Sequence, residues 1–552
     1  IAQVSCLEMP KADEEPPHDV NSEAVDLCLT MTVLLKAKIV DEIHFMRKIV
    51  IDGSNTSGFQ RTGLIAMEGK IKNVGIQTIA LEEDSARKIQ EKGKLVNYGL
   101  DRLGIPLIEI ATDPDIKNPN HAREVAERIG TLLRATGKVK KGLGTIRQDL
   151  NVSVKKGARI EIKGIQSLSS ISRVAEKEAK RQIGLIKIKE ILEKRITKKD
   201  LENIEIKDLA DLLKNSNSNL IKKQIQKKGI MKGFKLPGFN NLLKQKETRL
   251  GKEFATHARI ASGIGGIIHS DELPGFGIKD NEVEKIHKFF KTKKEDSFII
   301  AIGKEKIVKN ALYAVKARAK ASLNGVQNEV RRALEDGTTE YMRPMPGAAR
   351  MYPETDVEPT KINKKDIDRI KKNLPELPEV KEKRFVKEYK INKEQTKQIL
   401  NSGYQNEFEE LVKKYPKEKN VIIRTFLNTF SELEKEGIDT GFFDIKILLD
   451  ILENIKNKRF SKEAIPDILR YLAENKEKDI KKAIDECEIK KTSEEEIHKL
   501  AEKIIKERID FVKKRGHGAL GPLMGIIMKE LRGKADVKTI SKVLKKEIEK
   551  VI

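Results

Sequence analysis

The sequence feature that most constrains the fold is the alternation of polar and apolar residues over 146–163, IRQDLNVSVKKGARIEIK. A period of two predicts two β-strands, each with one buried and one polar face. The interruption Lys155-Lys156-Gly157 predicts a three-residue hairpin loop, in which Gly157 can take a positive φ. The chain is therefore expected to contain an antiparallel sheet.

The predicted pairing places two carboxylates on one face of this hairpin. If Val154 pairs with Ala158, Asp149 lies opposite Lys163. Asp149 and Glu161 are then diagonal neighbours, roughly 7–8 Å apart between backbones. Their side chains can converge on a common ion.

Glu109 is a third carboxylate, and it interrupts the apolar stretch GIPLIEIATDP. We expect this stretch to be a strand buried on both faces, where a charge needs a cation or a positive partner. Three carboxylates from neighbouring strands suit Mg²⁺, and therefore a Mg²⁺–nucleotide site for phosphoryl transfer. Salt bridges from Asp149 and Glu161 to basic residues of the hairpin are the simpler interpretation, and the pattern alone leaves both open.

Two glycine-containing loops are candidates for phosphate or substrate contact. The first, KKGLGT at 140–145, can set backbone N–H groups and a lysine against phosphate. The second, GSNTSG at 53–58, is not a P-loop, because Phe59 and Gln60 stand where Lys and Ser or Thr are needed. It can still touch substrate, although a plain turn is the commoner case. The candidate residues are Lys141, Gly142, Gly144 and Thr145 for nucleotide, and Ser57, Gln60 and Arg61 for substrate.

The length, charge and cysteine content of the chain limit which partners and which compartment are expected. A chain of 552 residues is long enough for several domains. Its net charge of +25 favours a polyanionic partner, although a solvated Lys/Glu-rich surface gives the same imbalance. No apolar run is long enough to cross a bilayer, so no membrane is expected. Three widely spaced cysteines form neither a disulfide framework nor a metal site, which indicates a cytoplasmic protein.

Helix signals and changes of composition divide the chain. A helical stripe covers 21–38, and Asn118 is suited to cap a second helix over 119–136. A compact α/β module is expected at 233–323. The Pro-, Gly- and Met-rich stretch 337–359 is expected to be functional or firmly packed on a neighbour. After it the chain is Lys/Glu-rich and helical.

Four of these stretches closely resemble the B/E family of tRNA-dependent amidotransferase subunits: DEIHFMRKIVIDGSNTSGFQRT, GIQTIALEEDSAR, LDRLGIPLIEIATDPDI and KGLGTIRQDLNVSV. The segment DGSNTSGFQRT and the inserted module are similar to those of the archaeal E branch of that family. The module itself resembles the GAD domain inserted in bacterial-type aspartyl-tRNA synthetases. TTEYMRPMPGAARMYPETDVEP resembles the family's return to the core, and GHGALGPLMGIIMKELRGKAD is similar to its YqeY-like tail.

The resemblance implies an α+β fold of several domains. A cradle domain with a mixed and antiparallel sheet is expected at 1–232 and 324–365. An α/β GAD domain is inserted at 233–323. A helical domain at 366–432 and a YqeY-like helical tail at 433–552, which binds tRNA, complete the chain.

The resemblance also implies an activity. Together with GatD, an asparaginase-like partner that frees ammonia from glutamine or asparagine, E-type subunits form a heterodimer or a higher heteromer. They use ATP and Mg²⁺ to phosphorylate the glutamyl γ-carboxylate of Glu-tRNA(Gln), and ammonia displaces phosphate to give Gln-tRNA(Gln), a carbon–nitrogen ligase reaction. The sequence agrees with an outside source of ammonia, since it has no GxSxG elbow and no Gly-flanked cysteine nucleophile.

The resemblance assigns roles to individual residues. Glu109, Asp149 and Glu161 match the acidic positions of the cradle and would be the catalytic and metal-binding groups. Arg147 and Lys163 could steady phosphate. In the tail, the candidates for tRNA contact are Arg515, His517 and Arg532.

One departure from the family concerns the start of the chain. The family's N-terminal Gly-Leu-Glu-Ile-His motif is absent from a sequence that begins at Ile1, so we expect the start of the gene product to be missing. An alternative is therefore a catalytically incomplete tRNA-binding or scaffold protein of the same family. An aspartyl-tRNA synthetase relative is rejected, because the sequence has no class II Gly-rich arginine motif.

Overall fold

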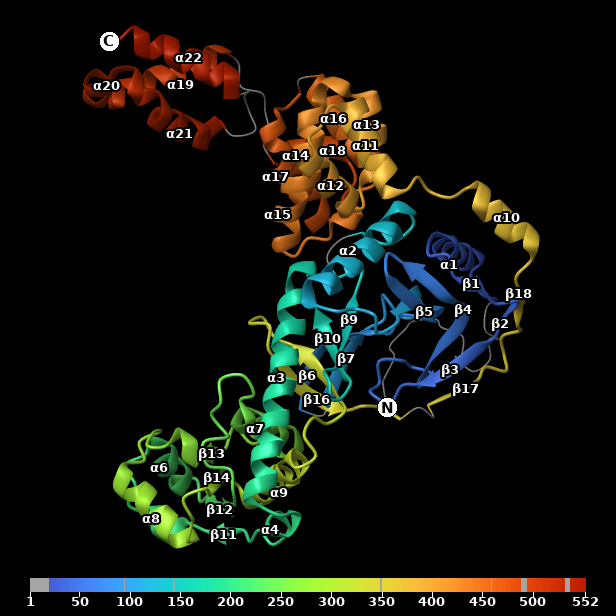
Figure 1. Cartoon of the computed structure of the whole chain (residues 1–552). Coiled ribbons are helices and arrows are strands. Elements are labelled where there is room, and N and C mark those ends of the chain that lie inside the picture. Colours follow the sequence, from blue (N-terminus) through green and yellow to red (C-terminus); the bar gives the residue numbers. More distant parts are fainter. Residues whose placement is uncertain are drawn as a thin grey trace.

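The computed structural model describes residues 19–93, 95–141, 144–165, 167–347, 350–457, 459–487, 494–531 and 537–552. Figure 1 shows two sheets near the N-terminal end, a separate α/β module and a C-terminal series of helices. This arrangement confirms the predicted mixed α/β architecture with antiparallel sheets. Two predicted site residues, Gly142 and Arg532, lie outside the described residues. Within the described ranges, no helix combines the length and the apolar character that a bilayer crossing requires.

The first sheet runs in the order β17–β3–β4–β5–β8, with β1 paired to β4, and helix α1 packs on β4 and β5. The element bounds are Ser22–Leu34 for α1, Lys38–Ile39 for β1, Phe45–Ile49 for β3, Phe59–Ile71 for β4, Val74–Glu83 for β5, Pro106–Thr112 for β8 and Met351–Pro353 for β17. All its neighbouring strands are antiparallel. Two further short antiparallel pairs are made by β2 (Glu42–Ile43) with β18 (Thr360–Lys361) and by β6 (Arg87–Lys92) with β7 (Leu95–Gly99).

Strand β8 is an edge strand, so the expectation of a strand buried on both faces is wrong. It is hydrogen-bonded to β5 on one side only. None of its residues is fully buried, and the side chain of Glu109 is 54% exposed. The apolar residues Ile108 and Ile110 are partly buried against the core beneath the sheet. An apolar sequence run thus marks a strand here without showing that both of its faces are covered.

The second sheet contains the predicted hairpin. Its four strands run in the order β16–β15–β10–β9, with β10 and β15 parallel. The bounds are Gln148–Val152 for β9, Ile160–Ile165 for β10, Glu329–Ala333 for β15 and Thr339–Pro344 for β16. Glu161 lies opposite Asn151, and the predicted register holds from Ile160 to Ile162. A register shift between Ile162 and Ile165 then interrupts it, so the predicted pairing of Asp149 with Lys163 is not part of the regular ladder. The positive φ in the loop belongs to Lys156, at 64°, and not to Gly157 as expected. The reason is that Gly157 N–H closes a turn onto the Val154 carbonyl at 2.8 Å, which puts Lys156 at the turn's third position.

Two long helices pack against each other beside this sheet, α2 (Pro119–Ala135) and α3 (Leu168–Arg195). The start of α2 confirms the predicted cap, because the Asn118 side chain accepts a hydrogen bond from His121 N–H at 2.9 Å. The helix predicted over 21–38 is α1, and Asn21 caps it by accepting from Ala24 N–H at 2.9 Å. Helical caps are thus among the features that local sequence determines.

The α/β module has its own antiparallel sheet, β11–β12–β14–β13, with helix α9 against it and helix α7 packed on α9. The predicted boundary at 233 falls inside β12. The core of the module is continuous with that of the second sheet, because Phe234 and Phe254 belong to the same buried cluster as Ile160. The bounds are Lys198–Glu202 for α4, Lys207–Asp208 for β11, Ala210–Leu213 for α5, Asn219–Gln226 for α6, Ile230–Leu236 for β12, Leu250–Ser262 for α7, Ile268–His269 for β13, Ser270–Glu272 for η1, Asp280–Phe290 for α8, Ser297–Gly303 for β14 and Glu305–Ser322 for α9.

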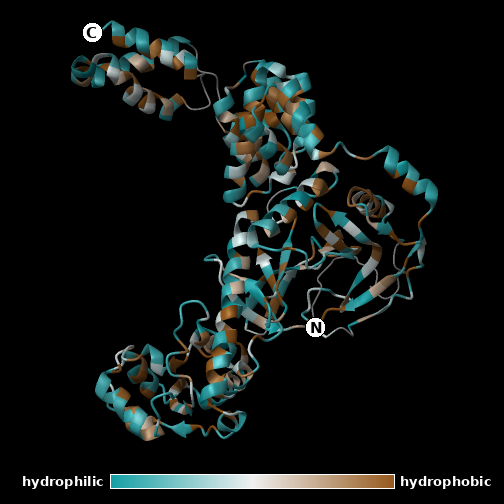
Figure 2. Cartoon of the chain, in the orientation of Figure 1, coloured by the Kyte–Doolittle hydropathy of each residue, from teal (hydrophilic) through white to brown (hydrophobic). Residues whose placement is uncertain are grey.

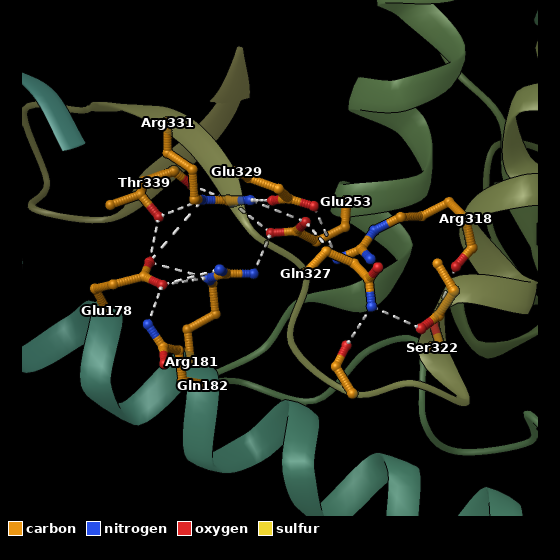
Figure 3. A network of polar contacts seen from close by, with 12 residues as sticks. Glu178, Arg181, Gln182, Glu253, Arg318, Ser322, Gln327, Glu329, Arg331 and Thr339 are labelled. Carbon is orange, nitrogen blue, oxygen red and sulfur yellow. Dashed lines mark hydrogen bonds and ion pairs between the residues drawn. The ribbon is translucent and has the colours of Figure 1, made fainter. Parts of the chain in front are cut away.

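A buried ionic network joins the module to α3 and β15 (Figure 3). Three carboxylates and three guanidinium groups face one another at this junction, and none of the six residues is more than 6% exposed. Glu253 is the centre, since Arg331, Arg181 and Arg318 donate to it at 3.1, 3.3 and 3.4 Å. The members are Glu178 and Arg181 of α3, Glu253 of α7, Arg318 of α9, and Glu329 and Arg331 of β15.

The C-terminal helices have two separate cores. Buried apolar residues from Phe385 to Ala483 form one cluster, and those from Ile497 to Ile548 form another. Figure 2 shows apolar residues turned inward in the first group. The predicted boundary after residue 432 falls inside α15, and Phe430 and Leu433 share one core across it.

The bounds of these helices are as follows. Helix α10 (Lys364–Lys372) packs on α1, where Ile370 joins the core of the first sheet. The first group comprises α11 (Pro378–Tyr389), α12 (Lys393–Ser402), α13 (Gln405–Lys414), η2 (Pro416–Glu418), α14 (Lys419–Arg424), the π-helical turn η3 (Thr425–Thr429), α15 (Phe430–Lys435), η4 (Thr440–Phe442), α16 (Ile445–Lys456), η5 (Lys462–Ala464), α17 (Ile465–Glu474) and α18 (Ile480–Glu486). The second comprises α19 (Glu494–Glu507), α20 (Ile509–Arg515), η6 (Gly516–Ala519), α21 (Leu520–Leu531) and α22 (Val537–Glu549).

Candidate active site

One face of the first sheet carries a row of charged and polar side chains from four adjacent strands. Lys48 of β3 is paired with Gln60 of β4. Both donate to Glu82 of β5, the Lys48 ammonium at 2.6 Å and the Gln60 amide at 3.3 Å. Glu109 of β8 lies opposite Ala80, which is two residues from Glu82 and therefore shares its face. The sheet thus places two glutamates and a lysine side by side.

The pKa of Glu109 is raised from its ordinary value to about 7. Partial burial is the largest cause, and the negative charge of Glu82 and a hydrogen bond between the two carboxyl groups add to it. The positive charges of Lys48 and Lys163 oppose this rise. The Lys48 ammonium nitrogen lies 4.0 Å from Glu109 Oε2. Glu109 therefore has too little positive charge around it to keep its pKa at the ordinary value.

The hairpin of the second sheet adds two more carboxylates and a lysine. Lys163 Nζ lies 3.1 Å from Asp149 Oδ2 and 2.9 Å from Glu161 Oε1. Burial alone would lower the pKa of Lys163, but its bonds to Glu161 and Asp149 outweigh burial and raise it. The positive charge of Lys163 also acts to lower the pKa of Glu109, so we treat the row and the hairpin together as one charged region. We name it the carboxylate face, made of Lys48, Gln60, Glu82, Glu109, Asp149, Glu161 and Lys163.

The carboxylate face has four carboxylates and only two ammonium groups, so it is suited to attract a cation. The predicted grouping of Glu109, Asp149 and Glu161 around one ion is not preassembled. No three metal-ligating side chains among the described residues stand close enough to hold an ion. Mg²⁺, however, commonly uses only one or two carboxylates and completes its shell with waters and phosphate oxygens. The adjacent pair Glu82 and Glu109 fits that requirement.

The other face of the sheet holds a structural group of ion pairs that includes Arg61. The Arg61 guanidinium donates to Glu354 at 2.7 Å and to Glu83 at 3.3 Å. Arg47 also donates to Glu354. Burial would raise the pKa of Glu354, yet the bonds from Arg47, the backbone N–H of Asp356 and Arg61 lower it to about 2. Arg61 is therefore occupied by protein carboxylates.

Arg147 and Ser57 also have protein partners of their own. The Arg147 guanidinium donates to Asp84 Oδ1 at 2.8 Å, and Arg102 donates to the same carboxylate at 2.9 Å. Arg147 thus points to Asp84 rather than to Asp149 or Glu161. Ser57 Oγ donates to the carbonyl of Phe59 at 2.8 Å, as expected for a plain turn.

The predicted phosphate loop lies against the C-terminal helices. The Lys141 ammonium pairs with Glu407 and lies 4.8 Å from the ring centroid of Tyr404. Lys141 and Thr145 line a cavity at that contact, and Gly144 takes a positive φ of 75°. The structure therefore places Lys141 beside α12 and α13.

The predicted tail residues lie at the turn between α20 and α21. The Arg515 guanidinium lies 5.2 Å from the ring centroid of Phe511. His517 belongs to the short helix η6 that follows. Figure 1 shows α20 and α21 in a tail that stands apart from the sheets.

Sequence reasoning missed Glu82 and Lys48. The signal was present, since Glu82 follows the alternating strand VGIQTIAL and is one of two consecutive glutamates. Glu354, which is 8% exposed, was also missed. Its partners Arg47 and Arg61 lie about 300 residues earlier in the chain, as their pairs with it show, and no local pattern signals such a contact.

Comparison with known proteins identifies the family. The family model described as the GatB/GatE catalytic domain matches residues 3–368, and the model described as the GatB domain matches residues 406–548. The chain is 45% identical over 549 residues to the E-type subunit of the glutamyl-tRNA(Gln) amidotransferase of Methanococcus maripaludis, covering 98% of this chain and 86% of that protein. It is 47% identical over 549 residues to the corresponding protein of Methanocaldococcus jannaschii, with the same coverage. The corresponding protein of Methanosarcina barkeri is 44% identical over 551 residues, again covering 98% and 86% of the two chains. The chain therefore belongs to the GatB/GatE family, among the E-type subunits of glutamyl-tRNA(Gln) amidotransferases, and is one subunit of a tRNA-dependent amidotransferase.

Proposed function

We propose that the carboxylate face is where the chain converts Glu-tRNA(Gln) to Gln-tRNA(Gln) with ATP and Mg²⁺. The observation that supports this most is the surplus of carboxylates on one face, with the pKa of Glu109 raised to about 7 beside Glu82. A divalent cation would remove that surplus and hold ATP phosphates against the same surface.

The proposed reaction has two balanced steps. An oxygen of the glutamyl γ-carboxylate bonds to the terminal phosphorus of ATP as the bond to ADP breaks, giving γ-glutamyl phosphate. Ammonia then attacks the activated carbonyl carbon, the bond to phosphate breaks, and a proton leaves the new amide nitrogen. In this scheme Glu82 and Glu109 hold the cation, which when bound lowers the charge on the phosphates. Lys48 and Lys163 keep the surrounding carboxylates in place and add positive charge beside the transferring group.

Ammonia is proposed to come from a GatD-like asparaginase partner. Of the described cysteines, Cys28 is fully buried, and burial raises its pKa to about 12. Burial raises the pKa of Cys487 as well. Neither is suited to be the thiolate nucleophile that some amidases use, which supports a division of labour between two subunits.

The remaining parts are assigned as follows. The module with sheet β11–β12–β14–β13 is proposed to be an inserted GAD domain, and the second group of C-terminal helices a tRNA-binding tail. The basic last turn of α20, with Lys513, Lys514 and Arg515, supports contact with tRNA phosphates.

An amidation assay with ammonium chloride tests the proposal without a partner. Substitutions Glu82→Gln and Glu109→Gln should each lower ATP-dependent formation of Gln-tRNA(Gln) by about 100-fold or more, because each removes charge that stabilises the transition state. Their tRNA affinity should stay near that of the unchanged chain. Glu124→Gln, on the exposed side of α2, is the matched control and should keep full activity.

The same assay weighs the alternative of a tRNA-binding scaffold, which the lack of a preassembled three-ligand group among the described residues favours. If the chain binds tRNA(Gln) but forms no amide with ATP, Mg²⁺ and ammonium, the scaffold is the better account. Full activity of Glu109→Gln would reject the carboxylate face as the reaction centre.

A further inference from the structure

A second site is indicated by a cavity of about 430 Å³ between the cradle and the C-terminal helices. Its walls come from the end of α2 and the loop after it on one side, and from α12, η3 and α15 on the other. Figure 1 shows α2 directly beneath this group of helices. The volume lies within the range of about 300–1,000 Å³ that small-molecule sites occupy. We name it the seam cavity.

The seam cavity contains a cation that has no protein partner. Among the described residues, the Arg134 guanidinium makes no ion pair and no hydrogen bond. Burial, with no nearby carboxylate to oppose it, lowers the pKa of Arg134. Arg134 is half-buried, and a partly buried charge without a counter-ion is unfavourable, so an anion from outside would stabilise it. Lys140 lines the same cavity, is exposed, and has no ion-pair partner within the described part of the chain.

The carboxylates nearest to the cavity are already engaged. Glu407 takes the ammonium of Lys141, the third cation of the lining. Glu434 accepts the hydroxyl of Thr440 at 2.6 Å. Arg134 and Lys140 are then the remaining cations of the described lining. The Thr440 hydroxyl is neutral, so its bond does not offset the charge of Glu434, and the described lining has one positive charge in excess. An anion is therefore favoured, and the guanidinium fork of Arg134 suits phosphate oxygens.

The opposite wall is an irregular helix, which is an independent indication of a site. Residues Thr425–Thr429 form a π-helical turn between two α-helices. Such turns are rare and often occur at functional sites. Phe426 of this turn stacks on Tyr404, with ring centroids 5.0 Å apart and planes at 15°, and with Leu427 it makes the apolar part of the lining. The cavity thus pairs a cationic end with an apolar wall.

We propose that the seam cavity binds the phosphate of a nucleotide, with Arg134 and Lys140 holding the phosphate and Leu427 on the apolar wall against the rest of the ligand. The nucleotide is either free in solution or part of bound RNA. The carboxylate face contributes no residue to this cavity, so the two sites are separate. A ligand here touches both α2 and the helices beyond it and holds them together.

Equilibrium dialysis with labelled inorganic phosphate and with AMP tests the proposal on the full chain. The buffer contains EDTA and no Mg²⁺, so that Mg²⁺-dependent binding at the carboxylate face does not contribute. Arg134→Gln should weaken binding at least about tenfold, which corresponds to about 1.4 kcal/mol. Arg134→Lys keeps the charge and should retain part of the affinity. Arg123→Gln, an exposed arginine on the same helix, loses the same charge outside the cavity and should bind as the unchanged chain does.

Thermal melting separates a binding role from a structural one. Because Arg134 is unpaired, Arg134→Gln should melt at or above the temperature of the unchanged chain. Phosphate should raise the melting temperature of the unchanged chain and not that of Arg134→Gln.

The source of the nucleotide follows from two arms of the experiment. If Arg134→Gln loses affinity for AMP, the ligand is a free nucleotide. If it loses affinity for tRNA in a filter-binding assay and Arg123→Gln does not, the ligand is a nucleotide of bound RNA. Affinities for phosphate, AMP and tRNA that are all unchanged by Arg134→Gln would overturn the proposal.

Discussion

The substitution Glu253→Gln should destabilise the junction between the α/β module and the second sheet. Glutamine has the shape of glutamate but lacks the charge, and its amide nitrogen cannot accept from an arginine. Three buried guanidinium groups would then face two carboxylates. Arg318 already has two buried nitrogens, Nε and Nη1, without an acceptor, so the network has no spare acceptor to replace the lost one.

The size of the effect follows from this geometry. Removing one partner of a buried ion pair costs about 3–5 kcal/mol, because the other partner stays buried and unpaired. In a unit of about 150–250 residues each kcal/mol lowers the melting temperature by about 2–4 °C, so a fall of about 6–20 °C is expected. The transition that changes should be the one that includes α7 and α9.

Differential scanning calorimetry with hydrogen exchange measures this effect and locates it. Exchange should accelerate in α7, α9 and β15, while the C-terminal helices stay protected. Glu305→Gln is the matched control, because Glu305 forms an exposed ion pair with Lys309 in α9, and it should leave the melting temperature unchanged within error. A melting temperature for Glu253→Gln that equals that of Glu305→Gln would refute the reasoning, since it would mean that solvent already screens the network.

Three further predictions concern pH, the carboxylate face and the tail. Arginine neighbours hold the pKa of Glu253 well below its ordinary value of 4.5. The stabilising contribution of Glu253 is therefore present above about pH 4.5 and is lost as the pH falls below that value. The difference in melting temperature between Glu253→Gln and the unchanged chain should accordingly narrow in acid and stay constant from pH 5 to 8. Lys163→Met should lower kcat/KM for amidation by about 10–100-fold and leave the tRNA affinity unchanged, because Asp149 and Glu161 lose the ammonium that lies between them. An equal loss of tRNA affinity would argue for a binding role of Lys163 instead. Charge reversal of Lys513 and Lys514 in α20 should weaken tRNA binding and reduce the slope of log affinity against log salt by about 0.7–0.9 per lost phosphate contact; an unchanged slope would remove this turn from the tRNA interface.

Features that depend on neighbours in the sequence were predictable. The hairpin of β9 and β10 has the predicted register as far as Ile162, because alternation excludes one-residue slips and the short loop selects among the remaining pairings. The caps at Asn21 and Asn118 depend on a side chain three residues from its partner. Asp149 and Glu161 accordingly share a surface, joined through Lys163.

Features that depend on distant parts of the chain were not predictable. Whether β8 is a central or an edge strand depends on which other strands pair with it, and the apolar residues around Glu109 do not indicate those partners. The buried pairs of Glu354 with Arg47 and Arg61 join segments about 300 residues apart, as their contacts show. Likewise, the Lys/Glu-rich helices after residue 365 have a uniform composition, so the division between the two C-terminal cores could not be located from it.

The most direct test of the proposed function follows an oxygen atom. Glu-tRNA(Gln) labelled with ¹⁸O in the γ-carboxylate is incubated with the chain, ATP, Mg²⁺ and ammonium chloride, and the inorganic phosphate is analysed by mass spectrometry. Phosphorylation of the γ-carboxylate predicts one ¹⁸O in each phosphate released with amide formation, and no labelled phosphate with Glu109→Gln. Gln-tRNA(Gln) formed together with unlabelled phosphate would contradict the account.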